Sequence, residues 1–435
     1  MRHLTSAISL MLTIAVPAVA LAHGSVSPQA RTERAIEFPD TAMYKTLVVD
    51  LHTHTVFSDG HVWPTIRVAE AQRDGLDGFA VTEHLEYQPH ITDIPHTDRN
   101  RSFEEARRAA AALDLIVIPG VEITRQGAPG HINAIFIKDA NELVKQRQEH
   151  QRLEEHMFDT REEAAAYAHE ASGIYRGAHQ VEHQGKQVWM PFDDVETYFT
   201  LVSYQHATTR SARNVVEAAN DQGAFLTWNH PSFESVGAPL TDFHAAAVED
   251  GLLHGIEVAN GSRYYQNAHR LALKHGLALI GVSDVHELIA ADYRPDAGHN
   301  PGHRPVTLLF AEDKMLDSMR EALFARRTVV WWKDTLIGRE RDLLPLLNAS
   351  IRIGAVETTS WGIRVHLRNE SDASFVLRND TGMKSASHSQ LIELPAHGET
   401  EVRFSMDDPR AVDLKFTVMN ALVAPNEAAV VTLTP

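Results

Sequence analysis

Cysteine is absent from the 435 residues, so the chain has no disulfide, no thiolate nucleophile and no thiolate metal site. Basic residues are also few: 40 Lys and Arg against 58 Asp and Glu give a formal net charge of −18. This deficit argues against a broad nucleic-acid-binding surface. An acidic chain can still bind an anionic substrate, provided that metal ions supply the local positive charge.

Long apolar runs are missing after the N-terminal segment, so no later stretch is expected to cross a bilayer. The first residues, Met1 to His3, are followed by an uncharged and mostly apolar run over residues 4–21. Small residues stand at Ala20 and Ala22. This pattern predicts a signal peptide over residues 1–22 and a periplasmic or secreted protein. An uncleaved membrane anchor is disfavoured, because the run is short and is interrupted by Ser, Thr and Pro.

Short apolar, β-rich runs alternate with amphipathic segments from about residue 45 to about residue 325. The predicted strands are residues 46–51, 78–81, 115–121, 134–137, 224–228, 255–258, 277–282 and 306–310. The predicted helices are residues 63–73, 103–113, 212–222, 264–275 and 314–325. Alternation of this kind indicates a parallel sheet, and this many repeats favour a (β/α) barrel.

Two other regions depart from this alternation. Residues 141–211 are charged and rich in Gln, Glu and His, and we expect an insertion with helices over 142–155 and 161–172. After about residue 341, seven short strands separated by turn residues indicate a small β-sandwich over 341–435. The predicted domains are therefore the signal peptide, a barrel over 23–340 with this insertion, and the sandwich.

Histidine is abundant, with 26 residues, and it is the commonest metal ligand in proteins. The strongest pattern begins at the end of the first strand, where His52 and His54 share one face because side chains alternate with period two. Other candidate ligands lie at or just past later strand ends. They are Asp59, His84, Glu122, His131, His230, Asp284 and His286. In α/β barrels this rim is where active sites assemble, so nine such residues predict a metal centre.

The motifs His-x-His, Ser-Asp-Gly, Thr-Glu-His, Gly-Val-Glu, Gly-His, Asn-His-Pro and Ser-Asp-x-His resemble those of the polymerase and histidinol phosphatase (PHP) family. The resemblance covers about residues 48–310. It implies a metal-dependent phosphoesterase with a distorted (β/α)7 barrel and two or three divalent ions. The first ion would be held by His52, His54, Glu122 and Asp284. Glu122 would bridge to a second ion held by His131 and His230, and Asp59, His84 and His286 would hold the third.

The signal peptide and the β-rich tail also resemble exported bacterial phosphodiesterases that act on alkyl and haloalkyl phosphate diesters. From the ligand types we expect Mn, Fe or Zn, and a metal-activated hydroxide as nucleophile. We expect Glu122, His230 and Asp284 to be the catalytic ligands. Arg125, Arg176 and His179 are the candidates for substrate binding, and Tyr264 and Tyr265 could form a wall of an ester pocket. The expected partner is a small phosphate ester, with no nucleic acid.

Three alternatives remain open from the sequence. A phosphomonoesterase of the same fold would use the same ligands. An amidohydrolase-type enzyme also begins with His-x-His, but it typically uses a strand Lys, whereas this chain has Glu122 at the third strand end. A non-enzymatic metal- or carbohydrate-binding protein would use the tail, although Trp361 is the only Trp there.

Overall fold

The computed structural model describes residues 35–434 except 91–92, 95, 97, 126–128, 145–156, 171–177, 184, 191–210, 232–236, 294–301, 386–389 and 406–412. The described residues all belong to one compact unit, Thr32–Pro435. The predicted signal peptide lies outside the described residues. Within the described part of the chain, no helix has the length and apolar character needed to span a bilayer.

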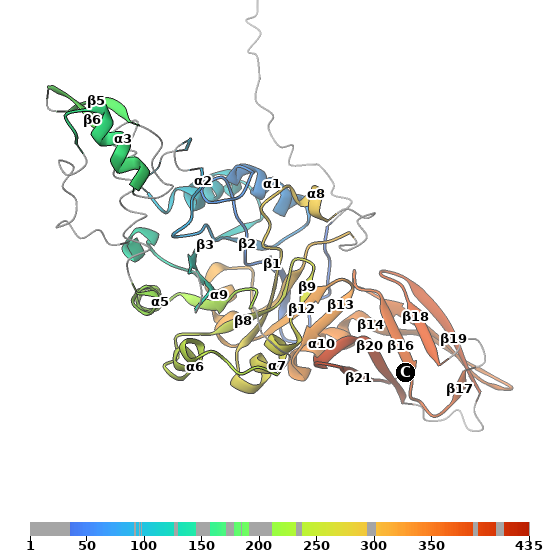
Figure 1. The fold of residues 1–435 in the computed structure, drawn as a ribbon. Coiled ribbons are helices and arrows are strands. Elements are labelled where there is room, and N and C mark those ends of the chain that lie inside the picture. Colours follow the sequence, from blue (N-terminus) through green and yellow to red (C-terminus); the bar gives the residue numbers. More distant parts are fainter. Residues whose placement is uncertain are drawn as a thin grey trace, which may run out of the picture. The chain divides into compact units, whose positions relative to one another are not determined.

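Seven strands follow one another around a curved sheet (Figure 1). Neighbours are parallel except around β4, which is antiparallel to both β3 and β7. The sheet closes where the chain after β1 meets the chain after β10, through a parallel bridge between Thr53 and Val285. The strands are β1 (Lys45–Asp50), β2 (Gly78–Val81), β3 (Ile116–Thr124), β4 (His131–Ile135), β7 (Phe225–Trp228), β8 (Gly255–Asn260) and β10 (Ala278–Val282).

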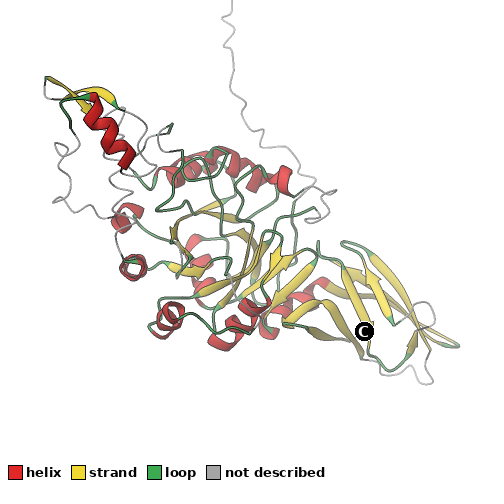
Figure 2. Cartoon of the chain, in the orientation of Figure 1, coloured by secondary structure: helices red, strands yellow, loops and turns green. Residues whose placement is uncertain are grey.

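Helices lie on the outside of these strands (Figure 2). They are α1 (Pro64–Arg73), α2 (Arg101–Ala110), α5 (Ala212–Asp221), α6 (Asp242–Glu249), α7 (Gln266–His275), α8 (Ile289–Asp292) and α9 (Leu316–Phe324). Capping interactions fix the ends of several of these helices. The Ser211 and Thr241 hydroxyls accept hydrogen bonds from the first turns of α5 and α6, and Gly276 takes the left-handed conformation that ends α7. The sequence pattern did not predict α6 and α8.

The C-terminal region is a two-sheet β-sandwich, as predicted, so the expected fold class is confirmed. Its strands are β14 (Ile351–Thr359), β15 (Gly362–Asn369), β16 (Phe375–Asn379), β17 (Lys384–Ser385), β18 (Leu391–Leu394), β19 (Glu399–Ser405), β20 (Leu414–Ala424) and β21 (Glu427–Leu433). One sheet has the order β14-β15-β19-β17. The other contains β20, β16, β18 and β21 and continues into the sheet of the barrel.

The junction between barrel and sandwich consists of elements that the sequence pattern did not predict. After β11 (Val306–Ala311), which is antiparallel to β1, come the hairpin β12 (Thr328–Trp332) and β13 (Thr335–Gly338), then α10 (Glu340–Ser350). Strand β13 pairs in parallel with β20 of the sandwich. The expected boundary at residue 341 thus falls inside α10. One apolar core includes residues of both regions, among them Val48 and Phe79 of the barrel and Phe404 and Phe416 of the sandwich.

The expected insertion is described only in part. The segment begins with a 3-10 helix, η1 (Ala140–Val144), and most of the helix predicted over residues 142–155 lies outside the described residues. The second predicted helix is present as α3 (Arg161–Glu170). It is followed by a hairpin that was not predicted, β5 (His179–His183) and β6 (Lys186–Met190).

Candidate metal centre

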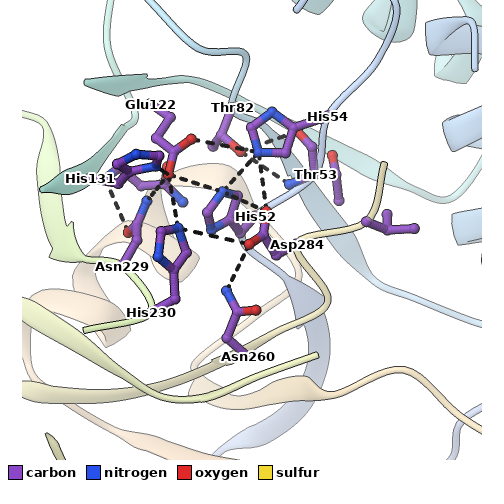
Figure 3. A network of polar contacts seen from close by, with 12 residues as sticks. His52, Thr53, His54, Thr82, Glu122, His131, Asn229, His230, Asn260 and Asp284 are labelled. Carbon is purple, nitrogen blue, oxygen red and sulfur yellow. Dashed lines mark hydrogen bonds and ion pairs between the residues drawn. The ribbon is translucent and has the colours of Figure 1, made fainter. Parts of the chain in front are cut away.

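All nine predicted ligand residues converge at one end of the barrel. Figure 3 shows six of them, which are His52, His54, Glu122, His131, His230 and Asp284. The nine residues come from the ends of β1, β2, β3, β7 and β10 and from the turn after β1, as the sequence pattern predicted. The exception is His131, which is the first residue of β4 and reaches the same end because β4 runs antiparallel. Gly60 makes the turn that carries Asp59 possible: a Cβ there would lie 2.7 Å from the backbone nitrogen of Thr55.

The first ligand group lies at the closed floor of the site. The Nε2 atoms of His52 and His54 are 3.0 Å apart, and Asp284 Oδ1 is 3.2 Å from each of them. Glu122 Oε1 lies 3.4 Å from His52 Nε2. Ligand atoms about 2.1 Å from a tetrahedral metal ion are roughly 3.4 Å apart, so these spacings suit a single ion.

Glu122 also belongs to a second group. Its Oε1 lies 3.0 Å from His131 Nδ1 and 3.5 Å from His230 Nε2, so one carboxylate faces ligands of both groups. A third group gathers around Asp59, which is 3.3 Å from His84 Nε2 and 3.1 Å from His286 Nε2. His84 can also join Glu122 and His131, since all three offer atoms within 4.8 Å of one another.

Two buried carboxylate oxygens show that the residues present fit metal ions. Glu122 Oε2 and Asp59 Oδ1 accept no hydrogen bond, although His84 Nδ1 and His286 Nε2 lie 2.6 and 3.1 Å away. Buried acceptors without donors are costly, and a cation among them removes that cost. The carboxylate and imidazole donors suit Mn, Fe or Zn.

The histidines of the site differ in the direction in which their surroundings shift the imidazole pKa. Burial and the neighbouring His84 lower the pKa of His54 to about 3, so this imidazole is neutral. Burial also disfavours the charged form of His84, but Glu122 and Asp59 outweigh it and raise the pKa of His84 to about 10. Despite burial, the facing carboxylates raise the pKa of His52, and that of His230 as well. The same histidines hold the pKa of Glu122 well below its usual range against the effect of burial.

Metal uptake near pH 7.5 should release protons. Because its pKa is raised to about 10, His84 is protonated at this pH, whereas a ligand nitrogen must be deprotonated. We expect at least one proton released per chain, less as the pH rises through 10. Calorimetric titration of the metal-free protein in two buffers of different ionisation enthalpy measures this. Heats that do not depend on the buffer would contradict the expectation.

Several residues that support the ligands were not predicted from the sequence. Glu257 on β8 is fully buried and accepts a hydrogen bond from His52 Nδ1, 2.8 Å away. Asn229 donates to Glu122 Oε1 at 2.7 Å, and Asn260 donates to Asp284 Oδ2 at 3.1 Å. Glu257 could have been noticed as an acidic residue inside the apolar run Gly-Ile-Glu-Val-Ala-Asn. The two asparagines carry no comparable signal.

Strained backbone accompanies two of the ligands. His230 and Asp284 have positive φ angles of 24° and 52°, a region that residues other than glycine rarely adopt. Strain of this kind persists where the surroundings hold it, often at functional sites. Here Asp50 accepts hydrogen bonds from Ser283 N and Oγ, and Arg304 pairs with Asp50 and Asp74, which fixes the residue just before Asp284.

The three residues predicted to bind substrate are Arg125, Arg176 and His179, and nothing in the structure tests that role. Arg125 follows the last residue of β3, and its guanidinium pairs with Glu86 at 2.5 Å. His179 is the first residue of the β5–β6 hairpin. Arg176 lies outside the described residues. None of the three is shown to bind substrate.

A pocket of about 480 Å³ opens beside the ligands. His230 and Asp284 line it together with Asn260, Arg263, Tyr265 and Tyr293. Arg263 belongs to β9 (Arg263–Tyr264), which forms a hairpin with β8, and Trp332 and Lys333 anchor this hairpin by donating to Gly261 O and Ser262 O. Of the two tyrosines considered earlier, Tyr265 lines the pocket, whereas Tyr264 bonds to His269 and packs near Trp332.

Comparison with known proteins agrees with this geometry. A family model described as a PHP domain matches residues 50–199, and one described as an Ig-like domain matches residues 353–434. A crystal structure from Bacteroides vulgatus, a two-domain protein containing a predicted PHP-like metal-dependent phosphoesterase, is 34% identical. The match covers 94% of this chain and 99% of that one, with a TM-score of 0.71. The chain belongs to the PHP family of metal-dependent phosphoesterases.

Two further solved structures match at lower identity. A putative metal-dependent phosphoesterase from Bifidobacterium adolescentis is 20% identical over 64% of this chain and 96% of its own, with a TM-score of 0.34. An amidohydrolase from Chromobacterium violaceum is 20% identical over 65% of this chain and 97% of its own, with a TM-score of 0.36. A search of curated proteins found no match.

Proposed function

We propose that this PHP enzyme hydrolyses phosphodiesters of small organic groups, with Mn, Fe or Zn held by the nine ligand residues. The observation that carries the proposal is the pocket beside His230 and Asp284, which offers room for an organic group next to the reacting phosphorus. A diester has two organic groups to place and a monoester only one. The acidic net charge fits a small ester better than a nucleic acid.

Some residues of the site bind the ions, and others orient those ligands. When bound, divalent ions in such a site lower the pKa of water and neutralise phosphoryl charge. Glu122, fully buried among ligands of two groups, holds its negative charge between them. Asn229 keeps its Oε1 in place. His230 and His286, with side chains 28% and 33% exposed, lie at the open side of the site, where a substrate can reach the ligand groups.

Arg263 and Tyr265 are assigned to the organic side of the substrate. Both residues line the pocket, and Trp332 and Lys333 anchor the hairpin that carries Arg263. The guanidinium adds positive charge beside Asp284, which favours an anionic ester. The Tyr265 ring offers an apolar face to an organic group.

The proposal is tested with matched aryl monoester and alkyl-aryl diester substrates after reconstitution with Mn, Fe, Zn or Co. We expect a higher kcat/KM for the diester with the most active metal. Tyr265→Ala should lower diester kcat/KM about tenfold, equivalent to about 1.4 kcal/mol, and change monoester kcat/KM less than twofold. Tyr264→Phe is the control, because that side chain packs away from the pocket.

A clear preference for the monoester would contradict the diester assignment and make the enzyme a phosphatase. Equal losses on both substrates in Tyr265→Ala would place the second organic group elsewhere.

A further inference from the structure

Glu257 is a buried carboxylate that contacts ligands of two different groups. It lies in β8 with an exposed fraction of 0%. Its Oε1 accepts a hydrogen bond from His52 Nδ1 at 2.8 Å. Its Oε2 accepts from the His230 backbone nitrogen at 2.5 Å and from Asn260 Nδ2 at 2.9 Å. Three hydrogen bonds therefore tie this carboxylate to two ligand residues and to Asn260.

The contact with His52 decides which ring nitrogen is available to a metal ion. A carboxylate oxygen only accepts, so the proton of the neutral imidazole must lie on Nδ1. The lone pair is then on Nε2, which faces His54 Nε2, Glu122 and Asp284. Carboxylates that hold a ligand histidine in this way fix both its tautomer and its ring orientation.

The contact with His230 acts on the backbone instead of the ring. His230 has a φ of 24°, and its amide hydrogen points at Glu257 Oε2. This hydrogen bond helps to hold a conformation that the residue would otherwise avoid, and it sets where the imidazole leaves the chain. The ring then reaches Glu122 Oε1, 3.5 Å from Nε2. Asn260 extends the network to a third ligand, because its Nδ2 also donates to Asp284.

We propose that Glu257 is a positioning residue that couples the two ligand groups sharing Glu122. An ion held by the group of His52 and Asp284 would fix the His52 ring against Glu257, and the same carboxylate holds His230 in place for the neighbouring group. The two positions should therefore fill together and not independently. The inference concerns metal loading and does not depend on whether the substrate is a monoester or a diester.

Glu257→Gln is a sharp test because an amide cannot satisfy both sides. If the amide oxygen faces His230 N and Asn260, its NH2 group faces His52 and forces the ring proton onto Nε2, which removes the lone pair from the metal position. If the oxygen faces His52, the NH2 group points at two donors. Either arrangement disturbs one of the two groups. Glu257→Asp keeps the charge but is one methylene shorter, so it cannot reach both partners.

The experiment measures metal affinity by competition of Mn²⁺ between the full-length protein and a fluorescent chelator. Thermal unfolding is recorded with and without metal. We expect two binding steps to weaken about 10–100-fold in Glu257→Gln, the usual size for losing such a partner, and Glu257→Asp not to restore them. The metal-free variant should unfold near the wild-type temperature while its metal-induced increase shrinks. Glu249→Gln, an exposed change at the end of α6, should match wild type throughout.

Two outcomes would overturn the proposal. Wild-type affinity and an undiminished metal-induced increase in Glu257→Gln would show that Glu257 does not position the ligands. Weakening of a single step, with the other unchanged, would show that the two groups load independently. Neither outcome bears on diester preference, which is measured separately with the ester panel.

Discussion

Glu122→Gln should remove most hydrolysis of phosphate esters and lower the metal content while the chain remains folded. Glu122 is fully buried, and its two oxygens face histidines from all three ligand groups. The amide keeps the shape but loses the charge that balances neighbouring cations, and it points an N–H group at ring nitrogens. A loss of about 4 kcal/mol of transition-state stabilisation corresponds to a fall in kcat/KM of roughly 10³-fold.

The measurement pairs kcat/KM with metal content by mass spectrometry and with circular dichroism. Glu249→Gln is the matched control, since it makes the same chemical change at an exposed position on α6. Asn229 should still donate to the carbonyl oxygen of the new amide, which keeps the local fold. Near-normal turnover in Glu122→Gln would mean that Glu122 does not bridge two ions.

The convergence of the nine candidate ligands could be predicted because each has a local signal. His52 and His54 follow an apolar strand at a spacing of two. His84, Glu122, His230 and Asp284 each lie within three residues of the end of another buried strand. In a parallel barrel such ends meet at one rim, so position along the chain suffices to place them. His131 shows the limit of the rule: it starts a strand, and it reaches the rim only because β4 is reversed.

The roles of the supporting residues could not be predicted, because those roles depend on distant partners. Glu257 and His52 are 205 residues apart, and Asn229 and Glu122 are 107 apart. Nothing near Asn229 or Asn260 distinguishes them from surface amides until the barrel closes. Arg263 is similar, since its place beside the pocket depends on the anchoring of its hairpin by Trp332. Arg125 is next to a ligand strand, yet its guanidinium pairs with Glu86.

The junction between barrel and sandwich illustrates a related limit. The sequence texture changes near residue 341, which suggested two separate units. In the structure the change of texture falls inside α10, where buried leucines at 343, 346 and 347 pack in the core shared by both regions. Composition identifies a change of secondary structure, but it does not show that a sheet continues across that change.

Deleting residues 351–435, the Ig-like region, should therefore prevent the barrel from folding. Strand β13 would lose its parallel partner β20, which pairs with Leu336 and Ile337. The buried leucines of α10 would lose Phe416 and the rest of the sandwich core from their cluster. The segment before β1 would lose Asp372, whose side chain accepts a hydrogen bond from Glu37 N and whose backbone amide donates one to Glu37 O.

The free energy lost by exposing this apolar surface is comparable to the whole stability of a folded domain. Exposing a buried Leu or Ile side chain costs about 1.5–3 kcal/mol, and a folded domain is stable by only about 5–15 kcal/mol in total. Five such side chains are buried in β13 and α10, namely Leu336, Ile337, Leu343, Leu346 and Leu347. We expect the truncated chain to be insoluble, or to show no cooperative thermal unfolding and no metal-dependent activity. Trp361→Ser is the control, because this side chain is 40% exposed at the β14–β15 turn. A soluble truncated barrel that unfolds cooperatively and hydrolyses esters would show that the shared core is dispensable.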